Sequence, residues 1–322
     1  MKNILTEDKE YNARITTHTD IEWIDKEAYV VISPPKEFDF KECMVYLGRS
    51  DIECLHRIKG EELYKLIKID DKMILFKVTS DNREVRISFL NEVPDERIKA
   101  QVVRYVWDMF DLGTDLPEFY RAMKGDSILE KLTEKYYGLR VIKINDLFEA
   151  LCWAIIGQQI NLKFAYTLKK RLVEGYGEGI KYKGQEYWLF PDPEVIAELD
   201  VANLKELQFT TRKAEYIISL AKHMISGELA IEKLKALNGY EAIHKRLLVM
   251  RGIGNWTADY VIMKSFNLNQ AFPISDVGLH NALKNILELD AKPSIEEIEK
   301  MAERWKGWES YATFYLWRSL YD

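Results

Sequence analysis

Residues 247–258 read Leu247-Leu248-Val249-Met250-Arg251-Gly252-Ile253-Gly254-Asn255-Trp256-Thr257-Ala258. One amphipathic helical pattern ends before the two glycines, and a second begins after them, with Asn255 or Thr257 able to cap it. Glycine permits a positive φ and lets another group approach the backbone closely. The amides and dipole of the new helix N-terminus favour an anion. The segment therefore predicts a helix-hairpin-helix that grips a phosphate without reading sequence, although a plain glycine-containing turn shares the Gly-x-Gly pattern.

An acidic residue follows about twenty positions later, in Phe272-Pro273-Ile274-Ser275-Asp276-Val277-Gly278-Leu279. Asp276 directly precedes a helical run, where aspartate is a common N-cap. A helix N-terminus favours the ionised form of such a carboxylate. An ionised, positioned carboxylate can also stabilise a sugar cation and activate water during glycosidic cleavage. Capping and catalysis are compatible, and the pattern leaves both interpretations open.

The period of the hydrophobic residues changes near Pro94, which divides the chain into two parts. Before it, short β-branched and aromatic runs predict strands at 29–33, 43–47, 73–78 and 85–89. After it, apolar residues at three- and four-residue steps predict helices. These are expected at 95–109, 116–123, 127–136, 146–157, 162–174, 193–198, 211–226, 230–237, 240–250, 257–265, 277–287, 295–304 and 310–320. The predicted fold class is α+β, with a strand-rich N-terminal domain followed by an all-helical body.

Composition excludes several classes of protein. The 322 residues, 47% hydrophobic and 30% charged, suffice for a sizeable core. No apolar run approaches the ~20 residues that span a bilayer, and the N-terminus turns acidic where a signal peptide would be apolar. Three cysteines are too few for a disulfide framework or a four-cysteine metal site, so we expect a reducing, cytoplasmic location. The five histidines show no metal-ligand spacing, so no catalytic metal is expected.

The net charge of −6 seems to oppose a nucleic-acid partner, but the charge is unevenly distributed. Residues 1–111 carry 18 Lys and Arg against 23 Asp and Glu, which leaves 28 against 29 in the remainder. Residues 240–285 around the hairpin hold five basic side chains against three acidic ones. Because salt screens distant charges, this local balance matters more to a phosphate backbone than the total.

Further motifs lie in order along residues 105–322. They are Phe110-Asp111-Leu112-Gly113-Thr114-Asp115-Leu116-Pro117-Glu118-Phe119-Tyr120, Tyr137-Gly138-Leu139-Arg140, the run at 148–161, Arg212-Lys213-Ala214-Glu215-Tyr216-Ile217, the run at 252–260, and the run at 305–318. With the hairpin and Asp276 they resemble the helix-hairpin-helix DNA glycosylase superfamily, and within it the alkylpurine branch, the 3-methyladenine DNA glycosylase II type. We accordingly expect a strand-rich domain at 1–94, a helical domain at 95–145 plus 267–322 that completes the active-site cleft, and a helical domain at 146–266 that ends in the hairpin.

The resemblance assigns roles to individual positions. Asp276 matches the catalytic aspartate, and Trp256, Tyr260 and Trp317 match residues that line the base pocket, where aromatic faces attract a cationic alkylpurine. Core packing is the alternative interpretation of these aromatic residues. DNA contacts are expected from Arg251, Gly252, Ile253, Gly254, Asn255 and Thr257 on the hairpin, and from Gln158 and Gln159, which match the loop that fills the gap left by an extruded nucleotide. The carbonyls of Leu248, Met250 and Gly252 match a monovalent cation site.

Basic side chains near these motifs are candidates for phosphate contacts, and we expect only some of them to touch DNA. They are Lys163, Lys169, Lys170, Arg212, Lys213 and Arg251.

Two departures from related branches refine the expectation. Bifunctional members carry a nucleophilic lysine where this chain has Trp256, so the resemblance implies a monofunctional enzyme that uses water. No cysteine follows Cys152, so no iron–sulfur cluster is expected after Asp276, and no other cofactor. The expected partner is damaged double-stranded DNA, bound by a monomer. A glycosylase for 8-oxoguanine or a deaminated base, and a non-catalytic DNA-binding protein, stay open as alternatives.

Overall fold

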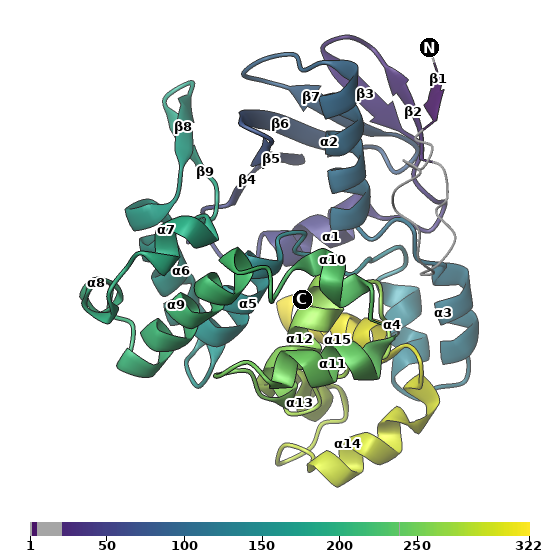
Figure 1. Ribbon diagram of the computed structural model, residues 1–322. Helices are drawn as coiled ribbons and strands as arrows, with labels where there is room; N and C mark the ends of the chain where they lie inside the picture. The colour runs from purple at the N-terminus through teal and green to yellow at the C-terminus, as the bar shows by residue number, and fades with distance from the viewer. Residues whose placement is uncertain (1, 5–20, 238) are drawn as a thin grey trace.

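A computed structural model describes residues 2–4, 21–237 and 239–322, and it confirms an α+β fold with a sheet domain ahead of a helical body (Figure 1). Seven strands form one antiparallel sheet in the order β1-β2-β3-β7-β6-β5-β4. The strands are β1 (Lys2–Ile4), β2 (Glu22–Asp25), β3 (Tyr29–Ile32), β4 (His56–Lys59), β5 (Glu62–Ile69), β6 (Lys72–Ser80) and β7 (Val85–Phe89). The sequence predicted β3, β6 and β7 and missed the other four.

The strand predicted at 43–47 is wrong, because these residues belong to helix α1 (Phe40–Leu47). Asp39 caps α1 by accepting a hydrogen bond from the amide of Glu42, and Phe40, Cys43 and Leu47 are buried on one face. A five-residue apolar run suits either a buried strand or a buried helix, so the cap and the helical spacing decided between them. Figure 1 places α1 between the sheet and the helical body.

Helices make up most of the remaining chain. They are α2 (Glu96–Met109), α3 (Leu116–Met123), α4 (Leu129–Lys135), α5 (Leu147–Gly157), α6 (Leu162–Tyr176), α7 (Pro193–Ala197), α8 (Val201–Glu206), α9 (Thr211–Ile225), α10 (Ile231–Lys235), α11 (Tyr240–Leu248), α12 (Asn255–Ser265), α13 (Val277–Ile286), α14 (Ile295–Ala302) and α15 (Glu309–Arg318). All but the short α8 were predicted. Helix α5 is buried around almost its whole circumference and packs against α6, α9 and α12, which makes it the centre of the body.

A two-stranded hairpin, β8 (Gly179–Tyr182) and β9 (Gln185–Trp188), interrupts the helices. Its turn residues Lys183 and Gly184 have φ values of 47° and 78°, as a two-residue hairpin turn requires. Tyr187 packs against Leu66 and Leu75 on the sheet. The β8–β9 hairpin therefore covers apolar surface of the sheet. Its own sequence does not predict this contact, because the covered residues lie far away along the chain.

Within the described ranges, no helix combines the length and apolarity needed to cross a membrane. The same part of the chain contains no group of three or more His, Cys, Asp or Glu placed to hold a metal ion. The three domain boundaries expected from the resemblance, at residues 94/95, 145/146 and 266/267, remain predictions.

Candidate active site

Helices α11 and α12 are joined by the turn at residues 249–254, so the hairpin forms where the sequence predicted it. Gly252 has a φ of 93°, and a Cβ there would lie 2.4 Å from the Tyr216 ring, so glycine is required twice over. Gly254 is the N-cap of α12, which corrects the prediction that Asn255 or Thr257 caps it. A Cβ on Gly254 would meet nothing within 4 Å, and no described side chain caps the helix. The first-turn amides are thus free of side-chain partners and suit an anion.

The hairpin residues expected to contact DNA divide by exposure. Arg251, Gly254 and Asn255 are exposed, whereas Ile253 and Thr257 are buried. Arg251 pairs with Glu215, with 2.8 Å between Nη2 and Oε2. Ile253 and Thr257 therefore pack inside the turn. Only the exposed side chains of Arg251 and Asn255 remain candidates for direct contact with DNA.

The two glutamines at the end of α5 have different surroundings. Gln158 donates from Nε2 to the carbonyl of Gly252 at 2.9 Å and to Oγ1 of Thr257 at 3.0 Å. Gln159 is exposed, with a φ of 57°, and directly follows the C-cap. Gln158 therefore stabilises the turn between α11 and α12. Gln159 is the exposed glutamine of the two and remains the candidate for insertion into a duplex.

Asp276 is the N-cap of α13 and lies at the centre of the site. Its Oδ1 accepts from the amide of Leu279 at 2.9 Å and from Nε1 of Trp317 at 2.8 Å. Its Oδ2 accepts from Nε1 of Trp256 at 3.1 Å. Three N–H donors from three helices complement the charge of a carboxylate and fix its orientation.

The three aromatic side chains predicted for the base pocket come together with this carboxylate. The Trp256 and Tyr260 rings stack with centroids 5.6 Å apart, and Tyr260 lies 6.1 Å from Trp317. A base sandwiched between two rings needs about 7 Å, twice the usual contact distance. The separations leave no room for a base to insert between neighbouring rings of this cluster, and the prediction that the three residues line a base pocket remains a prediction. They form a continuous wall, on which the half-buried Trp256 is the most exposed of the three.

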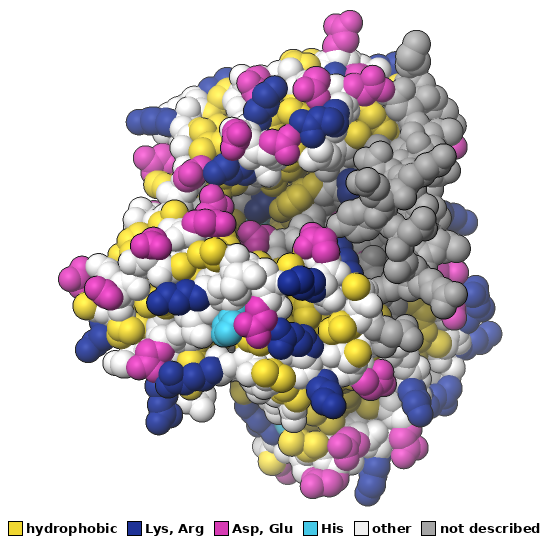
Figure 2. All heavy atoms as spheres, viewed as in Figure 1, with side chains coloured by type: hydrophobic (Ala, Val, Ile, Leu, Met, Phe, Trp, Pro, Cys, Tyr) yellow, Lys and Arg dark blue, Asp and Glu magenta, His cyan; other side chains and the backbone are white. Residues whose placement is uncertain are grey.

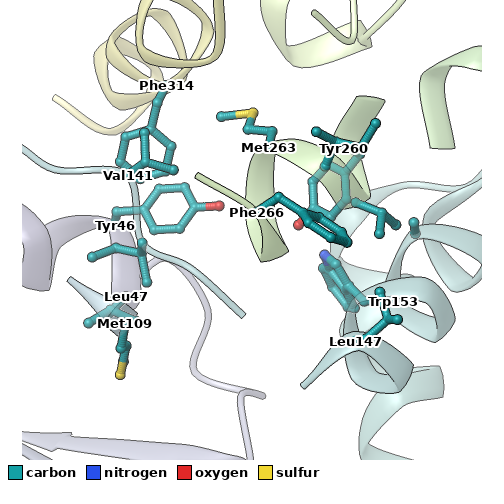
Figure 3. Packing of buried hydrophobic residues seen from close by; sticks show 14 of the residues in the cluster. Tyr46, Leu47, Met109, Val141, Leu147, Trp153, Tyr260, Met263, Phe266 and Phe314 are labelled. Atoms are coloured by element: carbon teal, nitrogen blue, oxygen red, sulfur yellow. The ribbon is translucent and has the colours of Figure 1, made fainter. Parts of the chain in front are cut away.

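Tyr260 is held from behind by a hydrogen bond with Trp153, and burial raises the pKa of its hydroxyl well above the usual value. Trp153 projects from α5 toward Tyr260 in Figure 3. The wall is thus anchored both to Asp276 and to the central helix.

Two of the basic side chains proposed for phosphate contact are buried instead. Lys169 is paired with Glu53 at 2.5 Å, and Lys213 donates to the carbonyl of Ile156 at 2.7 Å, where it helps to close the C-terminus of α5. Lys163 and Arg212 are exposed and Lys170 half-buried. On the face seen in Figure 2, basic and acidic side chains are intermixed.

Two of the three carbonyls predicted to hold a cation, those of Met250 and Gly252 but not of Leu248, accept a hydrogen bond within the described residues. Met250 accepts from the amide of Ile253 at 3.1 Å, and Gly252 accepts from Gln158. Each carbonyl oxygen retains a second lone pair, so the donor set fits a weakly held monovalent cation. Such an ion would lie between the hairpin and a DNA phosphate, and the site remains a proposal.

Sequence reasoning missed Gly278. A Cβ at this position would lie 2.9 Å from Oδ1 of Asp276 and 3.2 Å from Nε1 of Trp317. Glycine is therefore what lets the carboxylate and the indole meet. A glycine inside a predicted helix, two residues after the candidate aspartate, is the signal that could have found it.

Comparisons with known proteins identify the family of the chain. Residues 152–307 match the family described as HhH-GPD superfamily base excision DNA repair protein, and residues 30–151 match the N-terminal domain of 8-oxoguanine DNA glycosylase. The chain is 44% identical over 302 residues to the DNA-3-methyladenine glycosylase of Bacillus subtilis, covering 93% of this chain and 99% of that protein. It is 31% identical over 222 residues to DNA-3-methyladenine glycosylase 2 of Escherichia coli, covering 69% and 73%.

Among solved structures, the 3-methyladenine DNA glycosylase of Archaeoglobus fulgidus superposes with a TM-score of 0.76 at 26% identity, over 89% of this chain and 96% of that one. The two family models together cover residues 30–307, which include most of the sheet domain and the whole helix-hairpin-helix. The chain therefore belongs to the HhH-GPD superfamily of base excision DNA repair proteins.

Proposed function

We propose that this chain is a monofunctional DNA glycosylase that flips alkylated purines of the 3-methyladenine type from duplex DNA and hydrolyses their N-glycosidic bond, which leaves an abasic site. The observation that carries the proposal is Asp276, held by the indoles of Trp256 and Trp317 beside the anion-ready hairpin. The names of the B. subtilis and E. coli relatives support the substrate class.

The geometry suggests how the reaction proceeds. Hairpin amides hold a phosphate, and Gln159 occupies the space of the extruded nucleotide, whose removal costs a few kcal/mol. The base stacks against the aromatic wall. As the C1′–N bond lengthens, the Asp276 carboxylate stabilises the positive charge on the sugar and orients the attacking water. A base made cationic by alkylation leaves readily, so no second carboxylate is needed as an acid.

The monofunctional assignment rests on Trp256. Its indole stands where the resemblance places the lysine of bifunctional members, and it is engaged with Asp276. Lys264, two turns further along α12, is buried behind Tyr260. Its amine lies over the rings of Tyr46 and Phe314 and, among the residues that the structure describes, forms no hydrogen bond with Asp276.

Two alternatives remain. A non-catalytic DNA clip would have no use for a carboxylate held by two indoles, so the geometry disfavours it. A neutral lesion stays a candidate, because residues 30–151 match a domain named for 8-oxoguanine DNA glycosylase. Monomeric state and cytoplasmic location stay predictions.

Single-turnover base release tests the proposal. Wild type and Asp276→Asn would be incubated with duplexes that contain 3-methyladenine, 7-methylguanine, hypoxanthine, uracil or 8-oxoguanine, with and without subsequent alkali. Alkylpurine release by wild type, cleavage only after alkali, and loss of release in the variant are expected. Asp115→Asn is the matched control. Asp115 caps α3 as Asp276 caps α13, by accepting a hydrogen bond from the amide three residues later, but it is an exposed residue outside the candidate site.

Each contrary outcome removes a separate part of the proposal. Release that survives in Asp276→Asn would remove the catalytic assignment. Strand cleavage without alkali would overturn the monofunctional claim, and DNA binding without release of any base would favour the clip.

A further inference from the structure

A cavity of about 60 Å³ is lined by Tyr260 of the aromatic wall, together with side chains of α5 and of the sheet domain. Five Lys or Arg side chains line it against two Glu side chains. The space accommodates several water molecules or the edge of a planar ring. Figure 3 shows Tyr46 reaching from α1 toward Tyr260, Phe266 and Trp153 in this region. The cavity is thus a positively lined compartment that shares Tyr260 with the aromatic wall.

Lys264 is the unusual member of this lining. It is 2% exposed, and among the described residues its Nζ meets no hydrogen-bond acceptor. The amine lies 4.9 Å from the ring centroid of Tyr46 and 5.0 Å from that of Phe314. Burial, with the charges of Arg49 and Lys143 nearby, lowers the pKa of Lys264 well below its usual value. Whether neutral or charged, the amine keeps N–H donors with nothing to receive them.

The other basic side chains of the cavity each have an acceptor. Lys65 donates to the carbonyl of Leu55, Lys143 to those of Met263 and Phe266, and Lys169 to Glu53. Arg49 donates from Nη1 to the carbonyl of Tyr46 and stacks on the Tyr46 ring at 3.8 Å. An unpaired donor in a buried, positive compartment is costly unless a bound group accepts from it.

Arg49 also connects the cavity to the surface. It lines a second, outer depression of about 330 Å³ together with Leu162 and Lys163 at the start of α6. Those residues follow Gln159 by three and four positions. Arg49 therefore lines both the surface depression near Gln159 and the inner cavity that Tyr260 lines.

The compartment is electrostatically coupled to the reaction centre. Burial raises the pKa of Tyr46, and the charge of Asp276 adds to that increase. Burial also raises the pKa of Tyr321, which responds to both Arg49 and Asp276.

We propose that Arg49 and Lys264 are specificity-determining residues whose N–H groups donate to the carbonyl oxygen of an extruded 6-oxopurine. This inference rests on the proposed function and deepens it. A 6-aminopurine presents its own N–H donors at that edge, so it offers the pair no acceptor. Release of 7-methylguanine and hypoxanthine therefore depends on the pair, and release of 3-methyladenine does not.

Methylated duplex DNA tests this, because it releases 3-methyladenine and 7-methylguanine in one reaction. Wild type, Lys264→Met and Arg49→Met would be compared by chromatography of the released bases, with a hypoxanthine duplex in parallel. Each variant should lose 7-methylguanine and hypoxanthine release by about tenfold relative to 3-methyladenine. Lys264→Met should also raise the melting temperature, since an unpaired buried amine is removed. Lys41→Met, a 72% exposed lysine on α1, is the control.

Other outcomes overturn the inference. Equal loss of every base together with a lower melting temperature would make the pair structural. An unchanged ratio of released bases would show that neither side chain reads the lesion. Release of no base by wild type would overturn the proposed function itself, and the wild-type reaction alone reveals that case.

Discussion

Trp317 donates from Nε1 to Oδ1 of Asp276 at 2.8 Å, which joins the last helix of the chain to the N-terminus of α13. The same oxygen accepts from the amide of Leu279, and the other oxygen accepts from Trp256. The side chains that form the wall for a base therefore also orient the carboxylate. Substrate stacking and catalytic positioning are coupled through one hydrogen-bonded cluster.

Replacing Trp317 by Phe retains a ring and removes the donor. A hydrogen bond to a charged group contributes about 1.5–3 kcal/mol, so the single-turnover rate should fall by roughly 10- to 100-fold with little change in DNA affinity. Trp188→Phe on β9 is the matched control and should release base as wild type does. A wild-type rate in Trp317→Phe would show that the bond does not orient the reacting carboxylate.

Gly278→Ala should reduce base release without unfolding the protein. The new Cβ would lie 2.9 Å from Oδ1 of Asp276, so the carboxylate must shift. Displacements of about 1 Å cost on the order of 10²-fold in rate, whereas alanine favours a helix interior by up to ~1 kcal/mol.

The control for this substitution is Gly175→Ala in α6, where a Cβ would meet Leu207 at an ordinary 3.8 Å. Rates and melting temperatures of both variants would be measured together. Full activity in Gly278→Ala would show that the close contact is dispensable.

Gln158 and Gln159 should separate into a structural and a DNA-contacting residue. Gln158→Met loses two hydrogen bonds to the hairpin and should lower the free energy of unfolding by about 1–2 kcal/mol. Gln159→Met should leave stability within ~0.5 kcal/mol. It should slow release from a well-paired lesion more than from a mismatched one, because extrusion is then harder. Denaturant titration and paired duplex substrates check both, and equal stability losses would contradict the division.

His56 should make the sheet domain sensitive to acid. Burial lowers the pKa of His56 to about 4, against about 6.5 in the unfolded chain, while its Nε2 contacts the carbonyl of Leu47. The unfolded state therefore binds more protons between these values, so stability is complete above pH 6.5 and declines as pH falls toward 4. The loss is at most about 3 kcal/mol.

Denaturant unfolding of wild type and His56→Gln at pH 7 and pH 5 measures this dependence. The difference between the two proteins should shrink or reverse at the lower pH. His223→Gln, at a half-exposed pair with Glu228, is the control. A constant difference across the range would mean that His56 stays protonated or exposed.

Local sequence was sufficient to predict the helix-hairpin-helix formed by α11 and α12 and most of the other helices. Gly252 and Gly254 mark a turn through their own backbone freedom, and helix caps act over a single turn, although the close contact of Gly252 is with the distant Tyr216. The strand predicted at 43–47 failed because a short apolar run satisfies both periods. The β-hairpin formed by β8 and β9 was missed because its apolar contacts are made with a sheet that lies far away along the chain.

The sequence by itself determined the α+β class, the hairpin and the position of Asp276 at the start of a helix, because spacing and capping chemistry are encoded locally. Tertiary structure alone decided that Trp256 and Trp317, 20 and 41 positions from Asp276, both donate to it. It also decided that Lys169 and Lys213 are buried, and that Arg49 and Lys264 face one cavity. Helical periodicity defines a face but not its partner, and the partner depends on how distant helices exclude water together.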